Sequence, residues 1–400
     1  MMPLRAFTRF FSALACCSLG ACAGVAAPPP ALDAAVFPQI DAAIQHSIAQ
    51  GQTSGAAFWL ERHGQSHQQA YGHLSPEPQA APVALDTLFD AASLTKVVVT
   101  ATAVQLLIDD GKLAMDDRLA ARLPECAGGQ LDALTLRHLL THTSGLVPSL
   151  LPKPAWQGKA AALKLACASV PTDAPDKVFR YSDINFILLG LVVERVSGQP
   201  LEVFAQARIF APLGMASSGY LPLRRFEAAR IAPTQKTGAQ ANDRSAHFDL
   251  PRNHVLQGVV HDPTARFMGG VAGHAGLFTT LRDLAAFGRM LTDGGVVGGQ
   301  RFLSPQAVAR LSTVQSSDSV RERRSAGWDI DTPLSGPRGL VFPVGSFGHT
   351  GFTGVSLWVD PASDTYVVVL ANVIHQRGGP PITKLAGEVA TAAGRALHLG

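Results

Sequence analysis

The sequence predicts an α+β fold in which the two ends of the chain build one antiparallel sheet, flanked by helices, with a mainly helical region inserted between them. Three observations lead to this prediction. Residues 55–74 have the pattern of two strands near the N-terminus, and 355–361 and 365–373 have the pattern of two strands near the C-terminus. Between them, from 112 to about 220, apolar residues recur mainly with helical spacing.

The N-terminal elements come first along the chain. Residues 34–49 are expected to form a helix, and the first two strands surround the polar turn His63-Gly64-Gln65. The apolar run 89–107, "FDAASLTKVVVTATAVQLL", is expected to form a helix that ends at Gly111.

The elements after the helical region are a loop, a helix, a hairpin and a last helix. Residues 234–276 are polar and then glycine-rich, which indicates more loop than regular structure. A helix is expected at 281–291, residues 361–364 mark the turn of the C-terminal hairpin, and the last helix is expected at 382–397.

The composition indicates a globular protein, because 47% of the 400 residues are hydrophobic and only 16% are charged. The formal net charge is +3 and no basic cluster is interleaved with aromatic residues, which argues against nucleic acid as a partner. We expect one domain at 34–399, with a sheet part at about 34–112 and 325–399 and a helical and loop part at about 113–324.

The first thirty residues have the pattern of an export signal. Arg5 and Arg9 provide its positive region, and the apolar stretch 10–19 is too short to span a bilayer as a finished helix. The next residues, Leu19-Gly20-Ala21-Cys22, resemble a bacterial lipobox, in which Cys22 is lipidated and becomes the mature N-terminus.

Ordinary cleavage near 24–27 is the alternative to lipidation, although the prolines at 28–30 disfavour it. Both routes predict an exported protein. We therefore expect a signal peptide at 1–21, a linker at 22–33, and a periplasmic protein that a lipid anchor on Cys22 holds at the membrane.

Two cysteines, Cys126 and Cys167, remain beyond the signal. An oxidising compartment permits one disulfide between them, and two buried free thiols are the alternative. The sequence contains no C-x-x-C or H-E-x-x-H motif, so we expect no metal and no cofactor.

The first candidate catalytic motif is S-x-x-K at Ser93 and Lys96. Three residues make just under one helical turn, so both side chains project from one face, at a helix start with partial positive charge. A serine hydroxyl is a poor nucleophile until a neighbour takes its proton, and a desolvated lysine with a displaced pKa can do that. A surface serine and a lysine that reaches solvent are the alternative.

The second candidate motif is "FRYSDINFILLG", in which Tyr181 precedes an apolar helix. A tyrosine beside a cation can carry a proton between the serine and a leaving group, and Asp183 and Asn185 offer polar contacts to the lysine or the substrate. A tyrosine that packs at a helix start is the alternative.

The third candidate motif has two possible locations. Lys236-Thr237-Gly238 lies in a polar stretch without a strand pattern, whereas His349-Thr350-Gly351 leads directly into a strand. The N–H groups of an edge strand can bind an extended acyl substrate and complete an oxyanion hole, and glycine lets the backbone come close. The pattern therefore favours 349–351.

These three motifs in this order resemble the penicillin-recognising serine hydrolases, most of all the class C β-lactamase branch with its D-alanyl-D-alanine peptidases and esterases. The resemblance covers about 40–390 and includes "LTLRHLLTHTSGL" (134–146), "IFAPLGM" (209–215) and "DPASDTYVVVLAN" (360–372). It implies a β-lactamase/transpeptidase-like fold.

By position, the resemblance implies that Ser93 is the nucleophile and that Lys96 and Tyr181 are the general-base machinery. Thr350 and Gly351 would flank the substrate, and the N–H groups of Ser93 and Phe352 would form the oxyanion hole.

Two departures from the family pattern bear on the substrate. Asp183 stands where the family has asparagine, and His349 stands where true β-lactamases commonly have lysine, which weakens a fixed positive charge at neutral pH. Both departures disfavour an efficient β-lactamase.

The stretch 258–278 resembles segments of cell-wall-associated family members. Its residues His261, Asp262 and His274 could bind a metal, but the surrounding glycines favour a tight loop that lines the cleft. His142, in "THTSG", is expected to be structural, as a hydrogen-bonded residue after a helix.

Together with the export signal expected at 1–21, the resemblance implies a hydrolase that forms an acyl-enzyme on Ser93, of the D-alanyl-D-alanine peptidase type. Its substrate would be a peptidoglycan peptide or a small acyl compound. A carboxylesterase or a weak β-lactamase on the same fold is the alternative among enzymes. A non-catalytic peptidoglycan-binding module is the alternative outside catalysis, and the survival of all three motif residues disfavours it.

Overall fold

The computed structural model describes residues 32–150, 155–237, 250–251, 253–372 and 382–399. Cys22 and the predicted signal peptide lie outside these ranges, so lipidation and export stay predictions of the sequence. Among the described residues, none of the helices has the length and apolar character needed to cross a bilayer.

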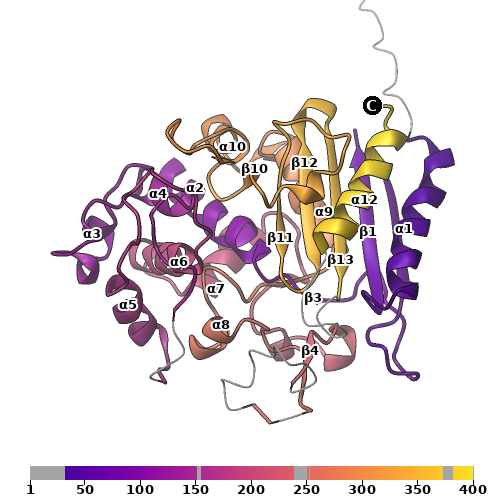
Figure 1. The fold of residues 1–400 in the computed structure, drawn as a ribbon, viewed down its shortest axis with the longest axis horizontal. Coiled ribbons are helices and arrows are strands. Elements are labelled where there is room, and N and C mark those ends of the chain that lie inside the picture. Colours follow the sequence, from indigo (N-terminus) through magenta and orange to yellow (C-terminus); the bar gives the residue numbers. More distant parts are fainter. Residues whose placement is uncertain (1–31, 151–154, 238–249, 252, 373–381, 400) are drawn as a thin grey trace, which may run out of the picture. The chain divides into compact units, whose positions relative to one another are not determined.

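One antiparallel sheet of seven strands, in the order β2-β1-β13-β12-β11-β10-β9, joins the two ends of the chain (Figure 1). The first strand pairs directly with the last, from Ala56 opposite Ala371 to Arg62 opposite Thr365. This confirms the predicted α+β class. The strands are β1 (Gly55–Arg62), β2 (Gln65–Gly72), β9 (Arg323–Arg324), β10 (Asp329–Asp331), β11 (Phe347–Gly351), β12 (Val355–Asp360) and β13 (Thr365–Ala371).

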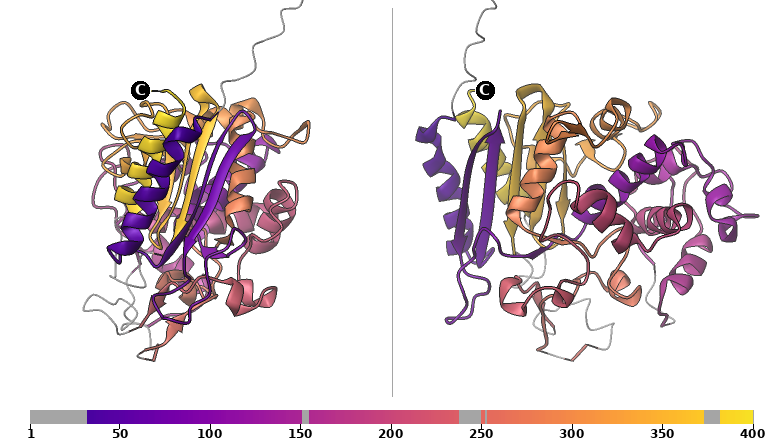
Figure 2. Two further views of the ribbon diagram at one scale, coloured as in Figure 1. Left: turned by 90° about the vertical axis from the view of Figure 1, so that its right-hand side faces the viewer. Right: turned by 180° about the vertical axis from the view of Figure 1, so that it is seen from behind.

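Two helices cover one face of this sheet. They are α1 (Phe37–Ala49), which follows a 3-10 turn at Ala34–Val36, and α12 (Ile382–Ala396), and they lie side by side (Figures 1 and 2). Phe58 and Leu60 of β1 point toward them, while Ala57 and Trp59 belong to the core on the opposite face. The alternation follows from the two-residue period of a strand.

The opposite face packs against α9 (Leu281–Thr292) and the helical region, which holds most of the apolar core. Its helices are α2 (Thr102–Asp109), α3 (Leu119–Arg122), α4 (Leu136–Leu140), α5 (Lys159–Cys167), α6 (Asp183–Ser197), α7 (Leu201–Ala205), α8 (Pro263–Phe267) and α10 (Pro305–Ser312). Two π-helical turns, η2 (Lys96–Ala101) and η4 (Gln206–Phe210), interrupt the regular helices. The helix at Lys96 therefore starts with a wider turn than a regular α-helix, a feature that is frequent at functional sites.

Short strand pairs lie outside the main sheet: β3 (Phe89–Asp90) with β6 (Phe278–Thr279), β4 (Gln235–Lys236) with β5 (Val255–Leu256), and β7 (Val296–Val297) with β8 (Gln300–Arg301). The β4–β5 pair corrects the prediction that 236 lies in a stretch without strand structure. The C-terminal part of the sheet begins with β9 at residue 323, beside the boundary expected at about 325.

A disulfide joins Cys126 to Cys167 and resolves the choice that the sequence left open. Cys126 ends the 3-10 turn η3 (Pro124–Cys126), and Cys167 ends α5. The bridge closes a loop with a sequence separation of 41 residues, which restricts the unfolded chain.

Replacing both cysteines by serine is expected to lower the free energy of unfolding by about 2–4 kcal/mol, because the unfolded chain regains the freedom that the bridge removes. Urea unfolding of the oxidised wild type and of the Cys126→Ser/Cys167→Ser variant measures the difference. A reducing agent should change the stability of the wild type alone. Equal midpoints for the two oxidised proteins would contradict the prediction.

Candidate active site

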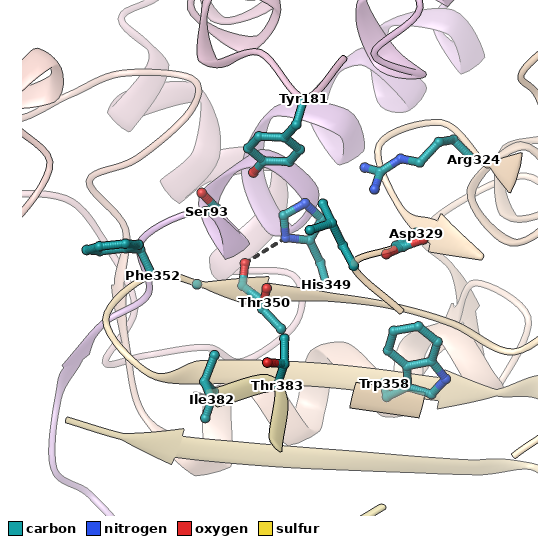
Figure 3. A pocket seen from close by; sticks show the side chains of 12 residues that line it. Ser93, Tyr181, Arg324, Asp329, His349, Thr350, Phe352, Trp358, Ile382 and Thr383 are labelled. Carbon is teal, nitrogen blue, oxygen red and sulfur yellow. Dashed lines mark hydrogen bonds between the residues drawn. The ribbon is translucent and has the colours of Figure 1, made fainter. Parts of the chain in front are cut away.

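A cleft with two lobes lies beside Ser93. The first lobe has a volume of about 310 Å³ and the second of about 180 Å³, and Ser93, Tyr181 and Phe352 line both. The first lobe, shown in Figure 3, is also lined by Arg324, Asp329, His349, Thr350 and Gly351. The second is also lined by Asp183, Gln235, His261, Asp262 and His274. The structure thus brings together all three motifs that the sequence singled out.

Ser93 follows a turn of unusual backbone conformation. Ala92 has φ of +44°, in the left-handed region that residues other than glycine seldom adopt. Asp90 supports this turn, because its Oδ1 accepts a hydrogen bond from the Ala92 N–H at 2.9 Å and its Oδ2 accepts one from the His261 N–H at 2.7 Å. The Asp90 carbonyl also accepts one from the Thr353 hydroxyl at 2.6 Å. A single buried aspartate therefore connects the Ser93 turn to two other segments of the cleft.

Lys96 is completely buried, and its ammonium group has three close partners. Its Nζ lies 2.9 Å from the Ser93 Oγ, 2.8 Å from the Asp183 Oδ1 and 3.1 Å from the His274 carbonyl oxygen. The Nζ also lies 5.0 Å from the centre of the Tyr181 ring. The expected pairing of Ser93 with Lys96 is present in the structure.

The charge of Lys96 differs from the expectation that burial displaces its pKa so that the amine can take a proton. Burial alone would lower the pKa of Lys96, but the Asp183 carboxylate and Tyr181 raise it above its ordinary value. Lys96 is therefore an ammonium at neutral pH. Asp183 is the physical reason, since an asparagine at this position would carry no compensating charge.

Tyr181 lies opposite Ser93, and its hydroxyl points toward the Ser93 hydroxyl (Figure 3). The ring of His142 packs 4.5 Å from the Tyr181 ring. The Ser182 N–H donates a hydrogen bond to the His142 Nδ1 at 3.1 Å. The Asn185 Nδ2 lies at the same distance from that nitrogen. The prediction that His142 is a hydrogen-bonded structural residue is confirmed.

Asn185 was expected to contact the lysine or the substrate, but its described contacts are with neither Lys96 nor the cleft, since it lines neither lobe. Its Nδ2 lies beside His142, and its Oδ1 accepts a hydrogen bond from the Ser144 hydroxyl at 2.6 Å. These contacts join its side chain to the segment that follows α4.

His349, Thr350 and Gly351 are the last residues of β11 and line the first lobe. The His349 Nδ1 lies 2.7 Å from the Thr350 carbonyl oxygen (Figure 3). Burial, together with Arg324 and Lys96, lowers the pKa of His349 well below its ordinary value, so this histidine is neutral at pH 7. A methyl group at Gly351 would lie 2.5 Å from the Ala91 carbonyl oxygen, which explains why glycine is needed where β11 passes the Ser93 turn.

Arg324 in β9 is a charged residue of the cleft that the sequence analysis did not single out. It is fully buried, and its guanidinium points into the space between Tyr181 and His349 (Figure 3). One nitrogen, Nη2, donates to the Gly327 carbonyl at 2.7 Å, but Nε and Nη1 have no hydrogen-bond partner among the described residues. A buried cation with two unused donors is costly unless a ligand completes it.

The nearby carboxylate of Asp329 is already engaged. The Thr332 hydroxyl donates a hydrogen bond to its Oδ2, and the Ser335 hydroxyl donates one to its Oδ1, each at 2.9 Å. Asp329 reduces the electrostatic cost of burying Arg324, but its hydrogen-bonding capacity is directed elsewhere.

Comparison with known proteins adds the family. A sequence profile of the beta-lactamase family matches residues 40–390, which is most of the chain. The chain belongs to the beta-lactamase family.

One sequence relative and two solved structures are similar to this chain. A protein of Escherichia coli K12, named provisionally as a D-alanyl-D-alanine carboxypeptidase, is 34% identical over 315 residues, which are 74% of this chain and 71% of that protein. The crystal structure of a penicillin-binding protein homologue from Caulobacter crescentus matches with a TM-score of 0.72 and 21% identity, over 92% of this chain and 99% of that one. A β-lactamase/D-alanine carboxypeptidase from Pseudomonas syringae matches with a TM-score of 0.70 and 21% identity, over 89% and 98%.

Within this beta-lactamase family member, the two candidate triplets for the third motif lie in different places. His349, Thr350 and Gly351 line the cleft. Lys236 belongs to β4 and the Thr237 hydroxyl donates to the Pro251 carbonyl, and neither residue lines either lobe. Gly238 lies outside the described residues.

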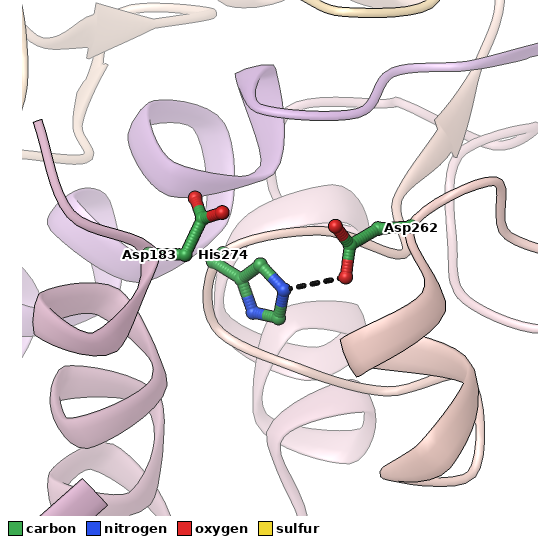
Figure 4. A group of neighbouring side chains, drawn as sticks. All are labelled: Asp183, Asp262 and His274. Atoms are coloured by element: carbon green, nitrogen blue, oxygen red, sulfur yellow. Dashed lines mark hydrogen bonds and ion pairs between the residues drawn. The ribbon is translucent and has the colours of Figure 1, made fainter. Parts of the chain in front are cut away.

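Of the three residues considered as metal ligands, the structure brings two together. The His274 Nε2 lies 2.8 Å from the Asp262 Oδ1, and Asp183 completes a group of ligand-type atoms within 4.8 Å of one another (Figure 4). His261 instead places its Nε2 2.7 Å from the Gln235 side-chain oxygen. The prediction that the protein binds no metal stays a prediction.

A pH-dependent stability follows from the position of Asp90. Burial raises its pKa from 3.8 to about 6, so the folded protein favours the protonated acid. The contribution of this group to stability is therefore greatest below pH 3.8 and is lost as the pH rises to about 6. Between pH 4 and pH 7 the wild type should lose about 2–3 kcal/mol more than Asp90→Asn.

Urea unfolding of both proteins at pH 4 and pH 7 tests this expectation. Asp318→Asn, at an exposed loop position, is the matched control and should behave like the wild type. The same pH dependence in wild type and Asp90→Asn would show that Asp90 is an ordinary carboxylate.

Proposed function

We propose that the protein is a serine hydrolase that forms an acyl-enzyme on Ser93, and that its substrates are peptides ending in a free carboxylate, as in a D-alanyl-D-alanine carboxypeptidase. The single observation that carries the choice of substrate is the buried Arg324 with two unpartnered nitrogens beside the candidate nucleophile. A planar guanidinium matches a carboxylate with two parallel hydrogen bonds. The neutral His349 supplies no competing charge in this lobe.

The reaction follows from the charges in the cleft. The Ser93 oxygen attacks the carbonyl carbon of the substrate. Its proton moves to the Tyr181 oxygen while the Tyr181 hydroxyl gives its own proton to the nitrogen of the scissile amide, so Tyr181 stays neutral. The Lys96 ammonium cannot accept that proton, but it stabilises negative charge that develops on both oxygens. The amide C–N bond then breaks, and the protonated nitrogen leaves as an amine. Water later attacks the Ser93 ester, and the same relay through Tyr181 carries one proton of that water to the Ser93 oxygen as the acid is released.

The leaving group fits the first lobe in this proposal. A terminal amino acid there directs its carboxylate toward Arg324 and its amide toward Ser93, with Thr350 along one side. The acyl part then occupies the second lobe, and the N–H groups of Ser93 and Phe352 receive the carbonyl oxygen. The likeness to the carboxypeptidase-named protein of Escherichia coli supports the same substrate class.

The nucleophile assignment predicts that Ser93 alone carries a covalent label after treatment with a fluorophosphonate or a labelled penicillin. Peptide mass spectrometry identifies the labelled residue. Ser93→Ala should remove both label and turnover, and Lys96→Ala should remove turnover to the same extent, since the two act as one unit. Ser66→Ala, at an exposed serine of β2, is the control and should label normally. A label on another serine would refute the assignment.

The carboxylate assignment predicts a selective defect in Arg324→Gln. Its kcat/KM for a peptide ending in D-alanyl-D-alanine should fall by roughly 10- to 100-fold, since a charged hydrogen-bonded pair contributes about 1.5–3 kcal/mol. Hydrolysis of p-nitrophenyl acetate, which has no carboxylate, should change little.

The neighbouring Arg323 is exposed, so Arg323→Gln is the matched control and should behave like the wild type with both substrates. The C-terminal amide of the same peptide should be a poor substrate for the wild type and equally poor for Arg324→Gln. Equal rates for acid and amide in the wild type would instead favour an esterase or a general acyl hydrolase.

A further inference from the structure

Two backbone N–H groups at the cleft, those of Ser93 and Phe352, have no hydrogen-bond acceptor among the described residues. The N–H groups on either side of Ser93 do donate, that of Ala92 to the Asp90 carboxylate and that of Leu94 to a backbone carbonyl, each at 2.9 Å. Ser93 and Phe352 line both lobes and lie at the same end of the first one (Figure 3). In the proposed reaction their N–H groups receive the carbonyl oxygen, and because they come from distant parts of the chain, other contacts have to hold them at one separation.

Phe352 lies in a tight turn that Thr353 ties to strand β3. The Gly354 N–H donates to the Gly351 carbonyl at 3.0 Å, so Phe352 and Thr353 are the two central residues of this turn. Thr353 is 2% exposed, and its hydroxyl donates to the Asp90 carbonyl at 2.6 Å. The residue after Phe352 is therefore bonded to β3, which leads directly into the nucleophile turn.

Asp90 carries this connection to Ser93. Its carbonyl accepts the hydrogen bond from Thr353, and its side-chain Oδ1 accepts one from the Ala92 N–H at 2.9 Å. The strand that contains Asp90 is itself fixed, because β3 pairs with β6. One residue thus holds both the residue after Phe352 and the residue before Ser93.

Van der Waals packing also presses the end of β11 against the nucleophile segment, but without direction. A methyl group at Gly351 would lie 2.5 Å from the Ala91 carbonyl oxygen and 3.2 Å from the Ala92 Cβ, so the two segments are in direct contact. Packing of this kind limits how close they come, whereas a hydrogen bond fixes a distance and an angle. Among the described residues, the hydrogen bond from Thr353 to Asp90 is the one that joins the turn to β3.

We propose that Thr353 is a positioning residue for the oxyanion hole. Its hydroxyl, held by the Asp90 carbonyl, fixes the direction of the Phe352 N–H relative to that of the nucleophile. This inference deepens the proposed acyl-enzyme function and rests on it. Thr353 lines neither lobe, so it acts through the backbone N–H beside it and touches no reacting atom. Donors that are already in place stabilise an oxyanion strongly, because they need no rearrangement when the charge forms.

The first test is Thr353→Val, which keeps the shape of the side chain and removes its hydroxyl. Loss of an oxyanion-hole donor lowers kcat by about 100- to 1000-fold, and a displaced donor should cost less. We expect kcat for p-nitrophenyl acetate to fall by roughly 10- to 100-fold, with KM changed by less than about twofold, because acylation and deacylation both pass through an oxyanion and slow together. Thr353→Ser keeps the hydroxyl and should recover most of this loss.

Thr365→Val is the matched control. Thr365 is also a buried threonine whose hydroxyl donates to a backbone carbonyl, that of Ser363 at 3.1 Å. It begins β13, whereas the residue of β13 opposite the cleft turn is Leu370, near the other end of the strand. This variant should keep the wild-type kcat. Urea unfolding confirms that each variant is folded.

The second test measures inhibition by phenylboronic acid, which becomes tetrahedral on a serine oxygen and places a boronate oxygen where the oxyanion forms. Its inhibition constant should rise in Thr353→Val by the factor by which kcat/KM falls, because both depend on the same two N–H donors. In Thr353→Ser the constant should stay close to the wild-type value.

Three results would overturn the proposal. They are a wild-type kcat in folded Thr353→Val, an equal loss of kcat in Thr353→Ser, and a lowered kcat in Thr353→Val with an unchanged inhibition constant, which is the signature of a merely structural role. If Ser93 of the wild type takes up no fluorophosphonate, the acyl-enzyme function itself fails. A labelled wild type together with an unimpaired Thr353→Val refutes the positioning role alone.

Discussion

The buried ion pair between Lys96 and Asp183 is the interaction on which the cleft depends. It joins the helix that follows Ser93 to the start of α6, and the same ammonium contacts the His274 backbone. Lys96 has no exposed surface, so it relies on these partners in place of water. Removing one member of such a pair typically costs about 3–5 kcal/mol, because the other charge stays buried and uncompensated.

Parts of the site set by short-range geometry could be predicted from the sequence. Ser93 and Lys96 are one helical turn apart, and the residues from His349 to Gly351 lead into a strand, so spacing alone places each group on one face or one edge. The α+β fold was predictable for the same reason, because apolar residues recur with the two-residue period of strands near the chain ends and with the helical period between them. Spacing alone does not predict that the first strand pairs with the last. That prediction also uses the apolar character of both β1 and β13, which have to be buried in a common core.

The charge of Lys96 and the presence of Arg324 could not be predicted in this way. A single lysine before an apolar run indicates burial. Whether that lysine is charged, however, depends on the carboxylate of Asp183 in another helix, which only the fold brings to 2.8 Å from the Lys96 Nζ. Arg324 lies in "RERRS", where nothing in the pattern separates it from its exposed neighbour Arg323. The pairing of Cys126 with Cys167 stayed open for a related reason, because it depends on a distance between two elements that no local pattern determines.

The sheet joins strands from opposite ends of the chain, and this has a consequence for the order of events during synthesis. Residue 56 pairs with residue 371, so the centre of the sheet has to wait until nearly the whole polypeptide has been made. Contacts of such long sequence separation form slowly, because a large loop must close before any of them contributes. The cleft, one wall of which is β11, therefore matures late. A nascent chain that lacks β13 has no complete sheet, and its serine has no finished environment in which to react.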